Sequence, residues 1–215
     1  MTGAMGGSVW SPDAGLLAVL AAAQGRGAIG PAPLADHVGH ALGFLVAWPD
    51  LAGATAILDL GSGGGLPGLV LAARLPETRI VLLDGRIARA KFLEAVVDEL
   101  GWAHRVAIVA ERAEAAAHRA DLRRGFPAVV ARSFGPPAAT AECGAGFLAP
   151  GGILVVSGPP GGARERWPAA PLGELGLELV DVVVSPRSFV VVRSVAPCPE
   201  RFPRRVGVPE HRPLF

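Results

Sequence analysis

The sequence predicts an α/β protein with a doubly wound, mostly parallel sheet. Three observations predict this class: short apolar segments recur along the chain, segments of helical length separate them, and a glycine-rich turn follows the first of them. A chain of 215 residues is suited to one such domain, large enough to bury a core without a disulfide or metal. Cys143 and Cys198 lie far apart without CxxC spacing, which argues against a zinc site or a disulfide framework.

Two helices are expected before the first strand. Ser11 is interpreted as an N-cap followed by proline, and leucines recur at helical spacing from Leu16 onward. A linker rich in glycine and proline then leads to a second helix at residues 34–48. We therefore divide the chain into an N-terminal helical segment, residues 1–50, and a sheet domain with a basic tail, residues 51–215.

Five apolar runs are interpreted as buried parallel strands, at residues 56–60, 79–83, 105–109, 128–131 and 153–156. The clearest helix between them is expected at residues 87–100. Residues 157–176 are rich in proline and glycine and predict a loop or a short helix. Residues 177–184 and 188–195 flank Ser185-Pro186-Arg187 and predict a closing antiparallel hairpin. The result is a seven-stranded sheet whose last strand is antiparallel.

Composition excludes several classes of protein. The chain has 20 Lys and Arg against 19 Asp and Glu, which excludes a generally polybasic nucleic-acid binder but not a local basic patch. The longest apolar run, residues 16–23, is too short to cross a bilayer, and no basic residue precedes it as in a signal peptide. We expect a cytoplasmic protein, monomeric, that binds neither a membrane nor a metal.

A glycine-rich turn occupies residues 59–68 (DLGSGGGLPG), after the first predicted strand. Glycines let the backbone turn sharply and approach a ligand, and the helix expected from Leu66 offers free N–H groups. Asp84 ends the second predicted strand, where a carboxylate can accept both hydroxyls of a ribose. Part of the turn also fits GxGxxG, so a dinucleotide-binding dehydrogenase is an alternative at this point.

Two features favour S-adenosylmethionine over a dinucleotide. Asp59 precedes the first glycine by two residues, where it can meet a cationic or polar group of the ligand and would be unfavourable beside a pyrophosphate. Residues 147–154 (FLAPGGIL) resemble the helix-end, turn and strand motif found late in the sheet of class I methyltransferases. This resemblance implies a Rossmann-like class I methyltransferase domain.

The turn, with its Leu-Pro-Gly ending, resembles that of the RsmG family, also called GidB. Its members methylate N7 of a guanine in 16S ribosomal RNA. Four further segments are similar to motifs of that family, at residues 36–42, 112–114, 131–134 and 204–214. The resemblance implies S-adenosyl-L-methionine as the cofactor. It also implies 16S ribosomal RNA or the small ribosomal subunit as the partner.

The resemblance implies a donor site formed at successive strand ends. Its residues are Gly61, Ser62, Gly63, Leu66, Asp84, Ala113 and Glu114. In this assignment the glycine turn shapes the donor pocket and Asp84 binds the ribose. The Ala113 backbone and the Glu114 carboxylate hold adenine.

The resemblance also implies residues near the transferred methyl group and the RNA. Arg132 matches an active-site arginine and is expected to hold the donor carboxylate or an RNA phosphate. Phe134 is interpreted either as a stacking partner for a flipped base or as a core aromatic. His37 is a candidate partner in the site, or else a helix-capping or solvated histidine. The tail arginines either contact RNA phosphates or stay solvated on a tail packed against the domain; they include Arg204, Arg205 and Arg212.

The chain departs from the family pattern at several positions. Ser157 stands where the family has a lysine, Pro127 where it has an acid. In the N-terminal motif, Asp36 replaces an arginine and His40 replaces an acid. These departures leave two alternatives: an enzyme with the same donor and another acceptor, such as a small molecule or other RNA, or a non-catalytic RNA- or donor-binding relative. Guanine N7 carries a lone pair and no proton, so this reaction predicts no catalytic base.

Overall fold

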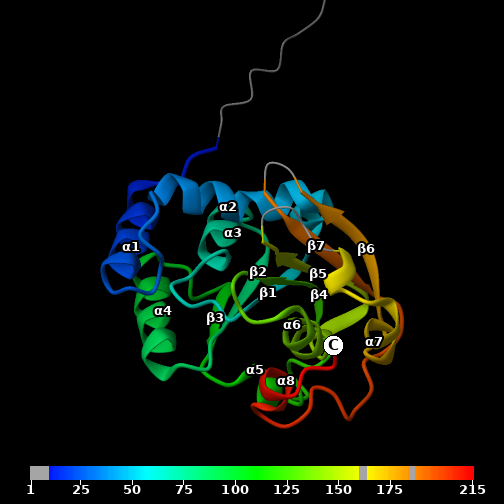
Figure 1. Ribbon diagram of the computed structural model, residues 1–215. Helices are drawn as coiled ribbons and strands as arrows, with labels where there is room; N and C mark the ends of the chain where they lie inside the picture. The colour runs from blue at the N-terminus through cyan, green and yellow to red at the C-terminus, as the bar shows by residue number, and fades with distance from the viewer. Residues whose placement is uncertain (1–9, 160–163, 185–186) are drawn as a thin grey trace, which may run out of the picture.

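The computed structural model describes residues 10–159, 164–184 and 187–215. Seven strands form one sheet in the order β3-β2-β1-β4-β5-β7-β6 (Figure 1). The β1–β2, β1–β4, β2–β3 and β4–β5 pairs are parallel, and β7 is antiparallel to both of its neighbours. The predicted fold class, a mostly parallel seven-stranded sheet with the last strand antiparallel, is confirmed.

The strands are β1 (Ala56–Leu60), β2 (Arg79–Leu83), β3 (Val106–Val109), β4 (Phe126–Ala131), β5 (Leu148–Ser157), β6 (Leu177–Val183) and β7 (Phe189–Ser194). The longer helices are α1 (Ala14–Gly25), α2 (Leu34–Ala47), α3 (Gly68–Arg74), α4 (Ile87–Glu99) and α6 (Pro137–Ala145). Shorter helical segments are η1 (Pro49–Gly53), α5 (Ala113–Ala116), η2 (Arg164–Arg166), α7 (Ala169–Glu174) and α8 (Val208–His211). None of the helices in these described parts of the chain is long and apolar enough to span a membrane.

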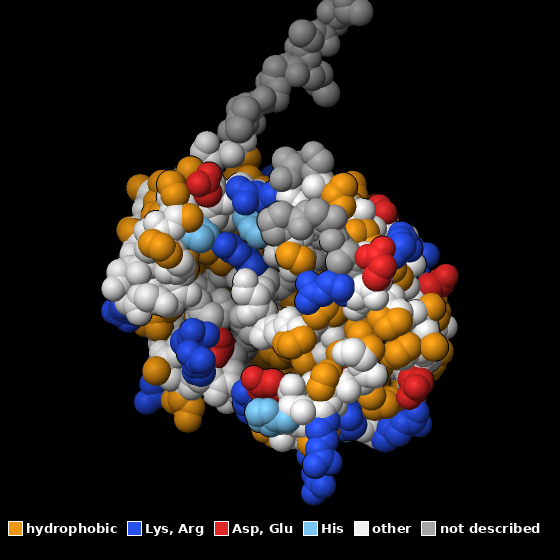
Figure 2. All heavy atoms as spheres, in the orientation of Figure 1, with side chains coloured by type: hydrophobic (Ala, Val, Ile, Leu, Met, Phe, Trp, Pro, Cys, Tyr) orange, Lys and Arg blue, Asp and Glu red, His pale blue; other side chains and the backbone are white. Residues whose placement is uncertain are grey.

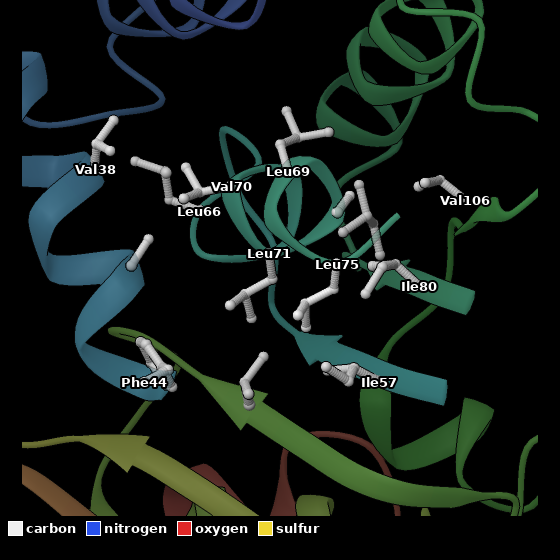
Figure 3. Packing of buried hydrophobic residues seen from close by; sticks show 14 of the residues in the cluster. Val38, Phe44, Ile57, Leu66, Leu69, Val70, Leu71, Leu75, Ile80 and Val106 are labelled. Atoms are coloured by element: carbon white, nitrogen blue, oxygen red, sulfur yellow. The ribbon is translucent and has the colours of Figure 1, made fainter. Parts of the chain in front are cut away.

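Helices cover both faces of the sheet and create two hydrophobic cores. Successive side chains of a strand point to opposite faces, so Ile57 enters one core and Leu58 the other. The first core packs α1, α2, α3 and α4 against the sheet, and Figure 3 shows Phe44 of α2, Leu71 of α3 and Ile57 of β1 within it. The second core contains side chains of α5, α6, α7 and the C-terminal segment. The N-terminal helices therefore share a core with the sheet.

Two helix starts differ from the sequence prediction. α1 begins at Ala14 because Asp13, not Ser11, is its N-cap: Asp13 Oδ1 accepts a hydrogen bond from the Leu16 N–H at 2.8 Å. α3 begins at Gly68 instead of Leu66. Residues up to Pro67 belong to the turn, because the Gly65 N–H donates to the Ser62 carbonyl at 2.7 Å.

The fifth strand also differs, since β5 begins at Leu148 and not at residue 153. A turn was predicted at the Pro-Gly-Gly segment, but the chain stays extended there. The register against β4 shifts between Phe126 and Ala128, and Gly151 adopts a φ of +75°. A bulge therefore absorbs the extra residues. The Ser185-Pro186 part of the predicted hairpin turn lies outside the described residues.

Candidate active site

The candidate site lies at the carboxyl ends of β1, β2, β3 and β4. In a doubly wound sheet the ligand crevice forms where the strand order reverses, and here this point lies between β1 and β4. A cavity of about 400 Å³ opens at these strand ends. Its lining includes the predicted residues Gly61, Asp84, Ala113, Glu114 and Phe134. Figure 2 shows the molecule hollowed on this face.

The glycine turn is folded onto the end of β2 by its own backbone. The N–H groups of Gly61 and Ser62 both donate to the Leu83 carbonyl at 2.9 Å. Gly61 has a φ of +75°, a left-handed conformation that favours glycine. A Cβ atom on Gly61 would lie 2.6 Å from Cδ2 of Phe134, so the half-buried ring packs directly on the turn. Phe134 thus lines the cavity and also contacts the second core.

Asp59 supports the turn from below. Its side chain is fully buried, and its Oδ2 accepts a hydrogen bond from the Gly68 N–H at the start of α3, at 2.9 Å. Burial raises the pKa of Asp59 to about 7, against the opposing effect of the Gly68 and Ser62 hydrogen bonds. The acid therefore titrates near neutral pH directly beneath the glycine turn.

Asp84 is held at the end of β2 in a fixed orientation. Its Oδ2 accepts from the Gly63 N–H at 2.9 Å, and its Oδ1 accepts from the Arg86 N–H at 2.8 Å. Arg89 lies 3.6 Å from the same carboxylate. Each carboxylate oxygen keeps a second lone pair, so Asp84 can still accept hydrogen bonds from ribose hydroxyls.

Glu114 lies on α5 and is 3% exposed. Its Oε1 accepts hydrogen bonds from Arg112 Nη2 and the Gly207 N–H, both at 3.0 Å. Burial favours the protonated form, but these hydrogen bonds outweigh it, and the pKa of Glu114 lies below its ordinary value. Its Oε2 is buried with no hydrogen-bond partner among the described residues. This ionised acceptor in the cavity wall fits the amino group of adenine.

A second cavity of about 230 Å³ lies beside the first and shares Gly61, Arg89 and Ser133 with it. Ser62, Gly63, Leu66 and Arg132 line this smaller cavity. The structure therefore brings the predicted donor-site residues to two adjoining spaces. The larger space holds Asp84, Ala113 and Glu114, and the smaller one holds the rest of the glycine turn and Arg132.

Arg132 is anchored by a histidine of α2. Its Nη2 donates to His37 Nδ1 at 2.7 Å, and His37 Nε2 lies 3.0 Å from the Gly30 carbonyl. This pattern corresponds to neutral His37 with the proton on Nε2. Arg132 Nη1 is buried with no partner among the described residues, which leaves a donor for a carboxylate or phosphate. Burial and the nearby Arg187 lower the pKa of Arg132 from its ordinary value.

Comparison with known sequences identifies the family. Residues 34–158 match the GidB family model, described as rRNA small subunit methyltransferase G. The chain belongs to the GidB family. A relative of that name from Thermotoga sp. (strain RQ2) is 35% identical over 166 residues, covering 74% of this chain and 72% of the relative. Another, from Syntrophomonas wolfei, is 33% identical over 191 residues, which cover 86% of this chain and 87% of the relative.

The chain spans 66% of the length of a third relative of the same name, from Parasynechococcus marenigrum, to which it is 34% identical. Two solved structures share its fold. An O-methyltransferase from Bacillus cereus in complex with SAH has a TM-score of 0.61 at 14% identity, covering 86% of this chain and 93% of that one. A cofactor-bound protein from MTB has a TM-score of 0.59 at 19% identity, and the match covers 87% of this chain and 93% of that protein. The predicted GidB family is confirmed, and its description names a methyltransferase that acts on small-subunit rRNA.

Two of the departures from the GidB pattern lie in contact. His40 Nε2 and Ser157 Oγ share a hydrogen bond of 3.0 Å between α2 and the end of β5. Burial lowers the pKa of His40 to about 4, and the charges of Arg132 and Arg187 and the neighbouring His37 act in the same direction. At neutral pH a neutral histidine and a hydroxyl thus occupy the places of the family's acid and lysine. Sequence reasoning missed this pairing because 117 residues separate the two.

The predicted tail arginines lie in different surroundings. Arg204 is bound to the fully buried Glu142 of α6, to which it donates hydrogen bonds of 2.7–3.2 Å from its backbone N–H, Nε and Nη2. Arg205 and Arg212 are exposed. Sequence analysis missed Glu142, although an acid among the small residues of α6 (PAATAECGA) is a signal that it needs a partner. Within the described residues no group of three or more His, Cys, Asp or Glu side chains is placed to hold a metal ion.

Proposed function

We propose that this GidB protein transfers the methyl group of S-adenosylmethionine to N7 of a guanine in 16S ribosomal RNA. The observation that carries the proposal is the pair of adjoining cavities, with nucleoside-binding carboxylates in one and Arg132 in the other. The three relatives described above are each named ribosomal RNA small subunit methyltransferase G, which supports the substrate. We further propose that the enzyme works as a monomer in the cytoplasm on the RNA or the small subunit.

The larger cavity would hold the adenosine half of the donor. Asp84 would accept hydrogen bonds from the ribose hydroxyls. The unpartnered Oε2 of Glu114 would accept one from the adenine amino group. Phe134, packed on Gly61, offers an apolar face beside these polar groups. These contacts would fix the orientation of the bound nucleoside.

The smaller cavity would hold the groups nearest the reaction. S-adenosylmethionine supplies a methyl group activated by a positively charged sulfur. Arg132, oriented by His37, presents its free Nη1 to the donor carboxylate or to a phosphate of the RNA. Guanine N7 attacks with its lone pair and releases no proton, so the protein needs to align the reactants and exclude water. Neutral His40 is therefore not required as a base.

A second candidate is the same donor with a different acceptor. The contact between His40 and Ser157 favours it, because both family departures occur at one point near Arg132. His40 and Ser157 form a neutral hydrogen-bonded pair, whereas the family pattern has two charged groups there. The acceptor would therefore meet a surface of different charge.

Labelled methyl transfer separates these functions. Small ribosomal subunits from a strain lacking the modification are incubated with the protein and labelled S-adenosylmethionine, and the RNA is digested to nucleosides. Label in 7-methylguanosine would establish the reaction and its substrate. Donor binding without label would favour another acceptor, and absence of donor binding would favour a non-catalytic relative.

A further inference from the structure

The C-terminal segment, residues 198–212, is fastened to the domain at several points. Arg123 Nη1 donates to the Phe202 carbonyl at 3.0 Å, and His118 Nε2 contacts the Pro203 carbonyl at 2.8 Å. The Phe202 side chain is buried in the second core. Arg204 completes the attachment through Glu142. Figure 1 shows α8, in red, beside α6, which it contacts, and the Gly207 N–H just before α8 reaches Glu114 of α5.

The same segment forms part of the wall of the larger cavity. Pro209, which is buried, and Glu210 both line it, although they come from a part of the chain remote from the strand ends. The Gly207 N–H donates to Glu114 Oε1 at 3.0 Å, and Arg112 lies between Glu114 and Glu210, 3.9 Å from the latter. The segment therefore adjoins the end of the cavity where Glu114 would bind adenine.

We propose that this segment is part of the donor site, with Pro209 and Glu210 in contact with the adenine end of the donor. Glu142 and Arg204 act as a positioning pair that holds the segment there. The inference rests on the proposed donor and not on the proposed acceptor. It gives the segment a role that is distinct from contacting RNA.

The chemistry of the segment matches one nucleobase. Adenine has flat apolar faces and one exocyclic amino group that donates hydrogen bonds. The Pro209 ring offers an apolar surface, and the carboxylate of Glu210 can accept from the amino group alongside Glu114. A purine with a carbonyl at that position would place an acceptor against these carboxylates. The segment therefore favours adenosine over inosine.

The positioning pair is built to fix the segment. Hydrogen bonds from Arg204 satisfy the buried Glu142 carboxylate, and Arg204 Nη2 also donates to the Arg212 carbonyl at 2.8 Å. Arg204 therefore connects both ends of the stretch that carries Pro209 and Glu210. Gly207, with a φ of +82°, makes the turn that brings its N–H to Glu114.

Calorimetric titration of the full-length protein with S-adenosylhomocysteine, adenosine and inosine tests the inference. Glu210→Ala should weaken both S-adenosylhomocysteine and adenosine about five- to tenfold, by the same factor, because the contact lies at the nucleoside end. Glu210→Gln keeps an acceptor oxygen and should recover most of this loss. Arg204→Ala should weaken the donor tenfold or more, with partial recovery in Arg204→Lys. Arg205→Ala, on the same segment but exposed, is the matched control and should leave donor affinity within twofold.

Steady-state methylation gives a second readout. Glu210→Ala and Arg204→Ala should raise the KM for S-adenosylmethionine, with little change in kcat at saturating donor. A purely structural role would lower the fraction of active enzyme and leave KM unchanged. The inference is overturned if folded Glu210→Ala binds both ligands as the wild type does, or loses affinity for S-adenosylhomocysteine alone. Because the Glu210 side chain is 60% exposed, this variant tests the contact even if Arg204→Ala does not fold.

The outcomes separate this inference from the proposed function. A wild-type protein that binds no S-adenosylhomocysteine would overturn both. Weakened donor binding in the variants, together with no methylation of small subunits by the wild type, would support the segment's role and reject the ribosomal acceptor.

Discussion

The donor half of the site and its acceptor half are built in different ways. The donor half, in the larger cavity, rests on backbone N–H groups, two oriented carboxylates and a glycine turn, all at strand ends. The acceptor half lies where α2 meets the ends of β4 and β5. It consists of side chains that contact one another, His37 with Arg132 and His40 with Ser157. Figure 2 shows basic and histidine side chains gathered on one rim of the hollow.

The difference indicates which part can change. Backbone groups fixed by the sheet cannot be altered by a side-chain substitution without moving a strand, so the geometry of the donor half is hard to change. A pair of side chains in contact can be exchanged together. His40 and Ser157 are an example, because they stand at the positions where the family pattern has an acid and a lysine. In the proposed function, the donor half would specify the chemistry and the acceptor half the substrate.

The largest effect is expected from breaking the donor half at its glycine turn. Gly61→Ala would force a side chain onto a residue at φ +75° and drive its Cβ to 2.6 Å from Phe134. Donor affinity should fall more than a hundredfold, with a loss of about 1–3 kcal/mol in unfolding free energy. Titration with S-adenosylhomocysteine and urea unfolding measure the two effects.

Gly27→Ala provides the control for this variant. Gly27 also has a positive φ, +68°, but a Cβ there would meet no atom within 4 Å. Gly27→Ala should lower the free energy of unfolding by about 1 kcal/mol and leave donor affinity unchanged. Equal donor affinity in Gly61→Ala and the wild type would show that the turn does not approach the ligand.

Asp84→Asn should have the next largest effect. The substitution removes the charge that the Gly63 and Arg86 N–H groups orient, and it weakens the acceptor offered to the ribose. We expect a 10- to 100-fold loss of S-adenosylhomocysteine affinity, or about 1.4–3 kcal/mol. Asp181→Asn, an exposed acid on β6, is the charge-matched control. If 2′-deoxyadenosine bound the wild type as well as adenosine does, the ribose assignment would be wrong.

The placement of the proposed donor residues at one edge of the sheet could be predicted from sequence because its determinants are local. The glycine turn and Asp84 each follow a recognisable strand, and parallel strand ends meet at one edge whatever the side-chain packing. Element boundaries elsewhere were predicted less accurately: Asp13, not Ser11, is the N-cap of α1, and a bulge lengthens β5. Both depend on backbone geometry that residue types leave open.

The acceptor half and the tail could not be predicted in the same way. His40 with Ser157 and Glu142 with Arg204 are pairs between distant segments, and their meeting depends on how α2 and the tail pack on the sheet. Charge alone suggested an RNA role for Arg204, whereas its position shows a buried partner. The exposed Arg205 and Arg212 remain predicted RNA contacts.

A smaller effect is expected from changing the acceptor half. Ser157→Lys alone would place an ammonium beside His40, in surroundings already positive from Arg132 and Arg187, and should lower ribosomal RNA methylation about fivefold. Adding His40→Asp supplies the missing counter-charge. The double variant should match or exceed the wild type, with donor affinity unchanged throughout. Additive effects of the two substitutions in kcat/KM would show that the positions are not coupled.

A pH dependence of stability of opposite sign is expected in the two halves, with the smallest contribution from His40. The pKa of His40 is lowered to about 4 in the folded protein, below its ordinary 6.5, so His40 should destabilise the protein as the pH falls from 6.5 to 4. Partial exposure limits this to about 1 kcal/mol. The pKa of Asp59 is raised from 3.8 to about 7, so its protonated form contributes stability at acid pH that is lost as the pH rises to 7.

Urea unfolding between pH 4.5 and 7.5 of the wild type, His40→Gln and Asp59→Asn separates the two contributions. His40→Gln keeps a hydrogen-bonding side chain beside Ser157 without titrating, so its stability relative to the wild type should increase toward acid pH. The stability of Asp59→Asn relative to the wild type should increase in the other direction, toward neutral pH, because the wild type alone must ionise a buried acid. Parallel stability curves for all three proteins would show that neither group titrates with a shifted pKa, and that the two halves do not differ in this respect.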